Sequence, residues 1–569
     1  MFRSAVATVI FFGLSNCSPI NSAPSATVKN GTYTGVYSEQ YDQDYFLGIP
    51  YAQPPVGDLR FRTPSGLYNT SWSGSKPATQ YSSECYGYGS DQWNYPVSED
   101  CLYINIIRPA GREAEKLPIA FWIHGGGFYQ GGGIDQRYNI SFMVQNSVKI
   151  GKPIIGVNIN YRLSAWGFLS GSEEIKESGQ MNLGLRDQRL ALQWVQENIA
   201  AFGGDPEQVT IFGESAGAAS VGFHLTAYSG RDDKLFRGAI MQSGNPVSYG
   251  ALRDPLGYAD MYNAIIGRTP CVNATSQLAC LRQLPVEQLN TAINTTSAIL
   301  NTTAFMPIWD GDFIQKRTSL QLEAGEFVHV PIISGANSDE GTAFSASPVN
   351  TTDDFYTYLT AGGRGGIPAD LANQILEVYP DAPGVGPDAN VVQSLGDARP
   401  GPPFGAQFRR SASYFGDQVF IANRRLTCQT WAAAGVPAYC YRFNAIPAGI
   451  QPAIGVTHFQ EVSFVFLNTA GVGYLPAAVP PFTNKTANYF QLAHFIDSNW
   501  VSFVHDLDPN SWRETYAWTG GEQLWPQYDV SNPLNIVLDA NVSSYAEPDT
   551  YRKAGMDLIN ANNYEVYQR

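Results

Sequence analysis

Residues 209–220 read VTIFGESAGAAS and place one serine, Ser215, between Gly213 and Gly217. The run VTIF is β-branched and aromatic, as in a strand, and residues 218–225 have helical character. A G-x-S-x-G motif between a strand and a helix is the context in which the serine occupies a strained turn as a nucleophile. A side chain at either glycine would then collide with the neighbouring strand or helix. The competing interpretation is a small-residue turn that only lets a helix approach a sheet.

Short apolar runs that are typical of strands recur along the chain and alternate with helical patterns. The strand-like runs are 101–109, 117–123, 152–163, 236–244, 330–337 and 436–444, and the clearest helical patterns are 181–206 and 487–507. Residues 31–55 alternate and turn as antiparallel strands do. This order predicts the α/β class, with a mostly parallel central sheet and helices on both faces. No linker or repeat divides the chain, so we expect a single large catalytic domain over residues 24–569.

A nucleophilic serine also needs hydrogen-bond donors for the oxyanion. Residues 124–128, HGGGF, follow the apolar run IAFWI. Glycine suits this place because the backbone itself must approach the substrate oxygen. We therefore predict an oxyanion hole formed by the amides of Gly126 and Gly127 and of Ala216, the residue after the nucleophile. An ordinary glycine-rich turn is the alternative.

The acid that orients the base is expected after the serine, at the end of a strand. The loop at 338–341, SDEG, offers Asp339 and Glu340, and the pattern gives little preference between them.

The base must be one of six histidines, which are His124, His224, His329, His458, His494 and His505. The chain order serine, acid, histidine leaves the last three. His494 and His505 lie in the apolar helix at 487–507, where packing or surface roles are expected. His458 lies in a loop after the strand at 436–444 and is the predicted base.

The chain has 569 residues, 44% of them apolar, and a formal net charge of −15. This acidity argues against nucleic acid as a partner and favours solubility. No cluster of metal ligands and no cofactor motif is present, so we expect neither. The sequence carries no signal for an oligomeric state.

The N-terminus predicts secretion. Arg3 precedes the apolar run 5–14 and small residues follow, which is typical of a signal peptide at residues 1–23, cleaved near 18–23. We therefore expect an extracellular protein without a membrane anchor. Cys17 lies in this leader, and the other cysteines are Cys85, Cys101, Cys271, Cys280, Cys428 and Cys440. Secretion favours disulfides among them. Glycosylation acceptors fit this location and are Asn30, Asn69, Asn139, Asn273, Asn294, Asn301, Asn350, Asn484 and Asn541.

These features together resemble the type-B carboxylesterase family of α/β-hydrolases, which includes cholinesterases and fungal lipases. Residues 202–217, FGGDPEQVTIFGESAG, match the family's active-site signature, and residues 99–109, EDCLYINIIRP, match its second signature. The resemblance implies the α/β-hydrolase fold from about Gly31 onward and a serine carboxylic ester hydrolase. It also implies that Glu340 is the acid and His458 the base, and that Cys85 pairs with Cys101 and Cys271 with Cys280. Pairing of Cys428 with Cys440 stays open.

The resemblance also implies a polar network around the catalytic residues, formed by Glu214, Ser243 and Glu461. Some relatives are non-catalytic adhesion proteins that lack the serine, whereas this chain keeps all three catalytic positions. Trp93 falls where cholinesterases keep a choline-binding tryptophan, but its spacing to Cys101 departs by two residues, which favours an aromatic residue that lines or packs the gorge. Phe305 and Trp309 are expected as further pocket walls.

The short segment between Cys85 and Cys101 bears on the substrate. In the fungal lipases that the chain resembles, the corresponding loop is a much longer mobile lid. The short loop favours an esterase for small-molecule esters of short or medium chain length. A lipase or sterol esterase acting on lipid esters is the alternative, and a binding module on a hydrolase fold is a third.

Overall fold

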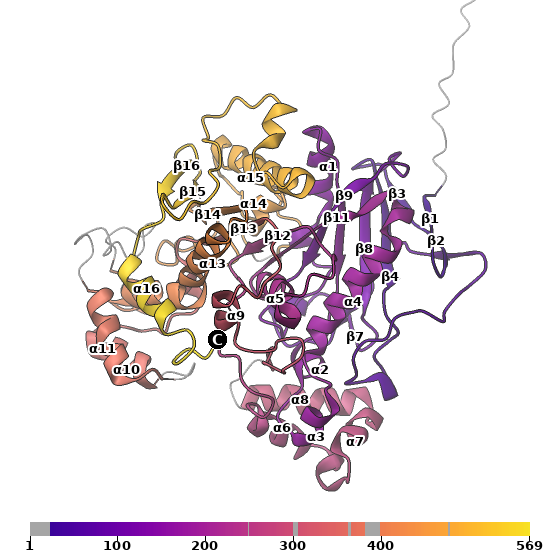
Figure 1. The fold of residues 1–569 in the computed structure, drawn as a ribbon, viewed down its shortest axis with the longest axis horizontal. Coiled ribbons are helices and arrows are strands. Elements are labelled where there is room, and N and C mark those ends of the chain that lie inside the picture. Colours follow the sequence, from indigo (N-terminus) through magenta and orange to yellow (C-terminus); the bar gives the residue numbers. More distant parts are fainter. Residues whose placement is uncertain (1–22, 248–249, 300–304, 362–365, 382–398, 476–477) are drawn as a thin grey trace, which may run out of the picture.

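The computed structural model describes residues 23–247, 250–299, 305–361, 366–381, 399–475 and 478–569. Its centre is an 11-stranded sheet in the order β16-β15-β14-β13-β12-β11-β9-β10-β8-β4-β3 (Figure 1). The strands are β3 Val36–Ser38, β4 Gln43–Pro50, β8 Tyr103–Pro109, β9 Leu117–Ile123, β10 Ile155–Ile159, β11 Gly204–Glu214, β12 Gly238–Gln242, β13 Ile332–Asn337, β14 Ala438–Phe443, β15 Leu534–Leu538 and β16 Tyr545–Pro548. Neighbouring strands are parallel from β10 to β15 and antiparallel at both edges. The prediction of a mostly parallel sheet is confirmed.

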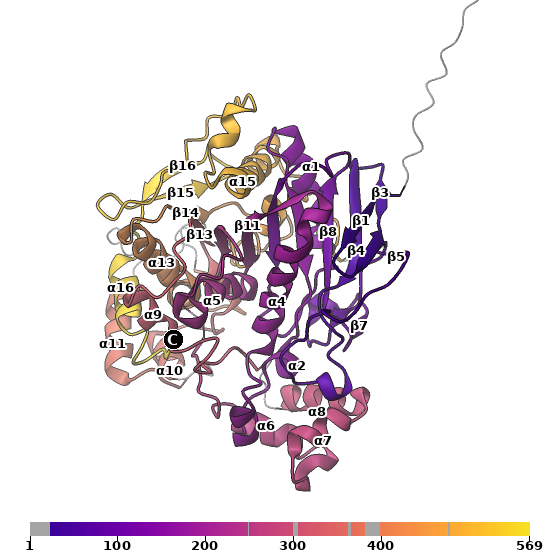
Figure 2. The same ribbon diagram turned by 45° about the vertical axis from the view of Figure 1, so that its right-hand side comes forward.

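Each face of the sheet carries its own apolar core. Strand β9 shows the alternation, because Phe121 lies in one core and the next residue, Trp122, lies in the other. The first core is covered by α4 Leu183–Asn198, α5 Ala216–Gly230 and α13 Ala422–Ala433, and the second by α1 Ser141–Lys149, α14 Val462–Val465 and α15 Ala487–Asp506 (Figure 2). A strand buried on both faces needs the near-continuous apolar runs that the sequence shows.

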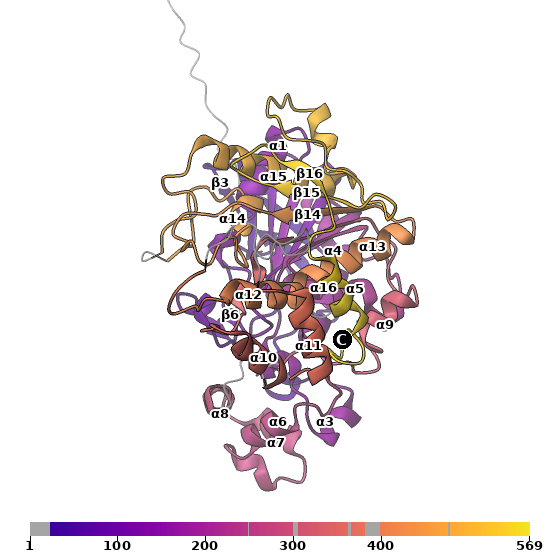
Figure 3. The ribbon, with the colours of Figure 1, turned by 90° about the vertical axis from the view of Figure 1, so that its left-hand side faces the viewer.

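The remaining helices form two groups beside the sheet (Figures 1 and 3). One group contains α6 Ala259–Ile266, α7 Gln277–Gln283 and α8 Val286–Ile299, and the other contains α10 Thr352–Ala361, α11 Ala369–Val378, α12 Phe408–Gly416 and α16 Lys553–Ala561. The second group has a separate apolar cluster, which includes Phe355, Leu371 and Met556. The structure also describes the short helices α2 Ser164–Phe168, α3 Glu173–Ser178 and α9 Thr318–Glu323. Two small sheets are formed by β1 Ser25–Val28, β2 Gly31–Thr34 and β5 Ser75–Pro77 and by β6 Glu84–Cys85 and β7 Val97–Ser98.

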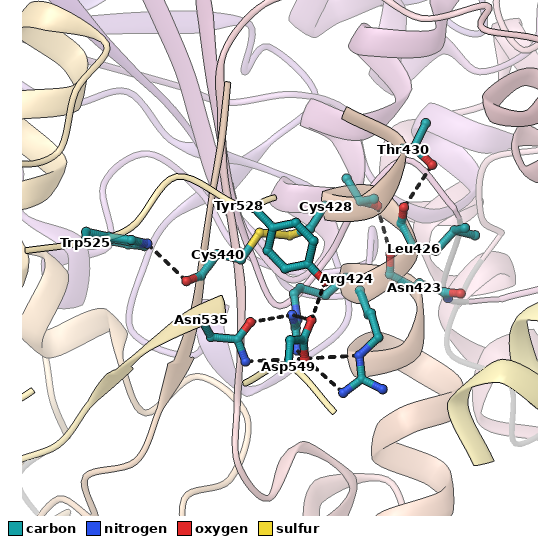
Figure 4. The surroundings of a disulfide bond; sticks show 12 residues. Asn423, Arg424, Leu426, Cys428, Thr430, Cys440, Trp525, Tyr528, Asn535 and Asp549 are labelled. Atoms are coloured by element: carbon teal, nitrogen blue, oxygen red, sulfur yellow. Dashed lines mark hydrogen bonds and ion pairs between the residues drawn. A yellow bond between two sulfur atoms is a disulfide. The ribbon is translucent and has the colours of Figure 1, made fainter. Parts of the chain in front are cut away.

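Three disulfides lie in the described residues: Cys85–Cys101, Cys271–Cys280 and Cys428–Cys440. The third joins α13 to β14, so the pairing that the sequence left open is present (Figure 4).

Beside this disulfide, Asp549 binds the buried guanidinium of Arg424 (Figure 4). It also pairs with a second buried guanidinium, that of Arg425. Tyr528 Oη also donates to its carboxylate, at 3.0 Å. The cluster ties α13 to the segment after β16 at the edge of the sheet.

The predicted signal peptide covers residues 1–23, and residues 1–22 lie outside the described residues, as does Asn301. Cleavage and secretion therefore stay predictions. Along the described residues, no helix combines the length and the apolar character that crossing a membrane requires.

Candidate active site

Ser215 occupies a sharp turn between β11 and α5. Its backbone has φ 56° and ψ −121°, outside the regions that L-residues usually adopt. A Cβ on Gly217 would lie 2.0 Å from Ile123 O, and a Cβ on Gly213 would lie 2.5 Å from the carbonyl carbon of Gly217. The predicted collision at both glycines is therefore confirmed. Ser215 is the partly accessible residue of a stretch that is otherwise buried from Val209 to Ala227.

The glycines after β9 approach this turn closely. A Cβ on Gly125 would lie 2.7 Å from Glu214 O and 3.2 Å from Ser215 Cβ, so a larger residue would push these neighbours away. Gly126 and Gly127 both have positive φ, of 88° and 62°. In the described part of the chain, no group accepts a hydrogen bond from either amide. Ala216 is the first residue of α5, where amides lack intrahelical partners. These amides are available to a ligand, as an oxyanion hole requires.

Glu340 and His458 meet at the carboxyl end of the sheet. Glu340 begins a 3₁₀-helix, Glu340–Ala343, which two residues separate from the end of β13, and it is fully buried. Its Oε2 lies 2.7 Å from His458 Nδ1. Its Oε1 accepts hydrogen bonds from Ser243 Oγ and from the Asn337 amide, the latter at 2.7 Å. These two donors fix the carboxylate so that its other oxygen faces the imidazole.

A second carboxylate faces the other ring nitrogen. His458 Nε2 lies 3.1 Å from Oε1 of Glu214, the residue before Ser215. Burial alone would lower the pKa of His458, but the carboxylates of Glu214 and Glu340 outweigh it and raise that pKa to about 9. Burial raises the pKa of Glu214 well above its usual range, against the effect of His458. The site therefore favours a proton on or near the imidazole.

Glu461 lies three residues after His458 in the chain and belongs to the same network. Its Oε2 accepts from Asn337 Nδ2 at 2.7 Å, and its Oε1 lies 3.4 Å from Gln242 Nε2. Burial and the nearby Glu340 raise its pKa. The structure thus brings together Glu214, Ser243, Glu340, His458 and Glu461 beside the Ser215 turn, and their catalytic roles stay predictions.

Comparison with known proteins decides the family. The family model described as "Carboxylesterase family" matches residues 22–553. The chain belongs to the carboxylesterase family. It is therefore a carboxylic ester hydrolase, and a serine mechanism is typical of this family.

Relatives and solved structures agree with this assignment. The chain is 34% identical to "Secreted lipase 1" of Botryotinia fuckeliana (strain B05.10), over 96% of this chain and 94% of that one. It is 34% identical to "Lipase 4" of Diutina rugosa, over 95% and 97%. The crystal structure of Aspergillus niger EstA superposes with a TM-score of 0.80 at 28% identity, covering 96% of this chain and 99% of that one. This carboxylic ester hydrolase therefore has the α/β-hydrolase fold.

Two aromatic residues that sequence reasoning missed pack against the imidazole of His458. Phe420 stacks on the His458 ring with centroids 4.7 Å apart, and Phe344 meets its edge at 5.1 Å. Phe420 lies in a π-helical turn, Asp417–Ile421, between α12 and α13. Such turns are rare and often occur at functional sites. Neither residue belongs to a local motif, so no sequence signal marked them.

The predicted pocket residues lie in different surroundings. Trp93 is 75% exposed at the end of a 3₁₀-helix, Ser90–Gln92, and is not packed against the core. Phe305 is buried against Tyr258, and Trp309 is partly buried at the same core. Their role as pocket walls stays a prediction.

The loop between Cys85 and Cys101 packs on the segment that follows the glycines at 125–127. The Tyr88 amide donates to Tyr129 O at 2.7 Å, and Arg137 pairs with Asp91 at 2.8 Å. Gln136 donates its amide to Tyr95 Oη at 3.2 Å. These contacts attach the loop along its length to residues 129–137.

Proposed function

We propose that this protein is a secreted serine carboxylesterase that hydrolyses short- to medium-chain esters through an acyl-enzyme. The observation that carries this proposal is the pair of contacts from His458 to Glu340 and to Glu214, next to the strained Ser215 turn. Family membership supplies the ester hydrolase activity. The names of the relatives, which include secreted lipases, support an extracellular location.

In the proposed mechanism, His458 takes the proton of Ser215 Oγ as this oxygen attacks the ester carbonyl. The carbonyl oxygen becomes an oxyanion that accepts hydrogen bonds from the amides of Gly126, Gly127 and Ala216. The intermediate collapses, and His458 gives its proton to the departing alcohol. Water then attacks the acyl-enzyme with His458 again as base, which frees the acid and restores Ser215. Glu340 stabilises the imidazolium and fixes its tautomer.

The disulfide loop supports an esterase over a lipase. A mobile lid exchanges its protein contacts for a lipid surface, whereas Tyr88, Asp91 and Tyr95 attach this loop to residues 129–137. A lipase that acts on long-chain lipid esters is the second candidate, because relatives at 34% identity carry lipase names. A non-catalytic binding module is the third candidate, and it would require that the Ser215 hydroxyl does not react with esters.

Hydrolysis of p-nitrophenyl esters from acetate to palmitate, beside an emulsified triglyceride, tests the proposal. We expect turnover of the short and medium esters and little turnover of the emulsion. Ser215→Ala should lower kcat by about a thousandfold or more. If the emulsion is the best substrate, the lipase candidate replaces the esterase. If Ser215→Ala matches the wild type, and a serine-directed phosphonate labels neither protein, the serine mechanism is wrong.

A further inference from the structure

Asp339 lies directly before Glu340 but points at a different partner. The residue is 3% exposed. Its Oδ2 accepts a hydrogen bond from the Val456 amide at 2.7 Å, and its own amide donates to Val456 O at 2.9 Å. Asp339 thus pairs in both directions with one residue, which lies two positions before His458.

Neighbouring residues of the same loop reinforce this pairing. Asn337 Nδ2 donates to Thr457 O at 2.8 Å, and Thr342 Oγ1 lies 2.8 Å from Ile454 O. Every one of these contacts joins the 337–342 segment to the backbone between 454 and 457. The histidine loop has no regular structure of its own in this stretch, so these bonds determine where its backbone lies.

Burial and nearby positive groups have opposite effects on the carboxyl group of Asp339. Burial raises its pKa to about 7, while the Val456 amide and the guanidiniums of Arg552 and Arg442 act in the opposite direction. Arg552 is paired with Asp417 and Arg442 with Glu547. In the described part of the chain, Asp339 Oδ1 has no hydrogen-bond partner. Val456 N–H is therefore the donor that holds this carboxyl group in its orientation.

We propose that Asp339 is a positioning residue for catalysis, which sets the place of the His458 imidazole by holding Val456. Glu340 orients the ring through its side chain, and Asp339 fixes the backbone that carries the ring. Two adjacent acidic residues thus serve one histidine by different routes. This inference rests on the proposed function, because it assigns His458 as the base.

The experiment compares Asp339→Ala and Asp339→Asn with the wild type, at a temperature where all are folded. Active sites are counted by titration with a serine-directed phosphonate, so that kcat refers to folded enzyme. A small displacement of a catalytic group costs up to about a hundredfold in rate. We expect Asp339→Ala to lower kcat by about 10- to 100-fold with KM nearly unchanged. Asp339→Asn keeps an acceptor without its charge, and we expect a loss of about threefold.

Asp354→Ala is the matched control. The surface Asp354 also accepts backbone amides, those of Asn350 and Thr351 at 2.9 Å each, but it lies at the start of α10. The kcat of the Asp354→Ala variant should equal that of the wild type. Hydrogen exchange of the 454–458 segment gives a readout without substrate, and it should be faster in Asp339→Ala than in the control.

Wild-type kcat in both Asp339 variants would overturn the proposal, and so would a change confined to KM. If Asp339→Ala does not fold, Asp339→Asn decides alone, and wild-type kcat there overturns it. An inactive wild type that the phosphonate does not label would instead remove the proposed function itself, and this inference with it.

Discussion

His458 Nε2 lies 3.1 Å from Glu214 Oε1, while Nδ1 of the same ring lies 2.7 Å from Glu340 Oε2. A base must be neutral to accept the proton of Ser215, yet two carboxylates stabilise its charged form. The pKa of His458, raised to about 9, lies above the value near 6.5 of an unperturbed histidine. We therefore expect activity to rise with pH well above neutrality.

Replacing Glu214 with Gln tests this expectation. The change removes the acidic group that contributes most to the raised pKa of His458. The imidazole then becomes neutral at lower pH, so the rising limb of kcat/KM against pH should move to lower pH. The measurement is a pH profile of ester hydrolysis for both proteins. A limb that stays in place, or moves to higher pH, would show that Glu214 does not control this ionisation.

Gly217→Ala should disrupt the serine turn. Its Cβ would lie 2.0 Å from Ile123 O, so either β9 or α5 must move, at a cost of about 1–3 kcal/mol. We expect a lower denaturation midpoint and a loss of activity that exceeds the loss of folded protein. Gly401→Ala is the control, because a Cβ there meets nothing within 4 Å. Equal effects of the two variants would contradict the packing argument.

Asp549→Asn should destabilise the fold without touching the site. It leaves the buried Arg424 and Arg425 without their shared carboxylate, and breaking such a pair costs about 3–5 kcal/mol. Asp557→Asn is the control: Asp557 pairs with Lys553 on the surface, and this pair contributes about 1 kcal/mol or less. Denaturant unfolding at pH 7 measures both, and a small effect at Asp549 would refute the prediction.

The same variant has a defined pH dependence. Although burial acts in the opposite direction, the two guanidiniums hold the pKa of Asp549 well below its usual range. The stabilisation is therefore complete above the unfolded value, near 4, and is lost as pH falls through the lower native value. The stability gap between wild type and Asp549→Asn should narrow in acid. A gap that stays constant down to low pH would mean that packing, not charge, explains it.

Two glycosylation acceptors that line one surface hollow of about 300 Å³ should differ in occupancy. Asn30 Nδ2 donates to Leu67 O at 2.8 Å and to Thr70 O at 2.6 Å, which uses both of its hydrogens. A sugar on Nδ2 would replace one hydrogen and separate these groups. Asn69 is exposed. We expect Asn69 to carry a glycan and Asn30 to be unmodified.

Peptide mapping after enzymatic deglycosylation in heavy-oxygen water measures both sites. Asn30→Ala should also lower stability by about 1–3 kcal/mol, whereas Asn69→Ala should not. A glycan found on the Asn30 peptide would show that this side chain does not need its two bonds.

Local patterns in the sequence determined the framework of this protein. Nearly continuous or alternating apolar residues marked the strands from β8 to β14 in the sequence. Strands that are covered on both faces exclude most polar side chains, which produces this pattern. The glycines around Ser215 marked the turn, because contacts within a few residues of it exclude larger side chains. Both kinds of signal are short-range and therefore readable in one sequence.

Only the tertiary structure decided which partner each of the two adjacent acids contacts. From the residues, Asp339 and Glu340 were equivalent, and the family resemblance was needed to choose Glu340. In the fold, Glu340 Oε2 reaches His458, whereas Asp339 Oδ2 reaches Val456. Phe420, more than 30 residues from His458 in the chain, packs on its ring. Partners so far apart in the chain leave no periodic pattern, because their contact depends on how the loops after β13 and β14 meet at the edge of the sheet.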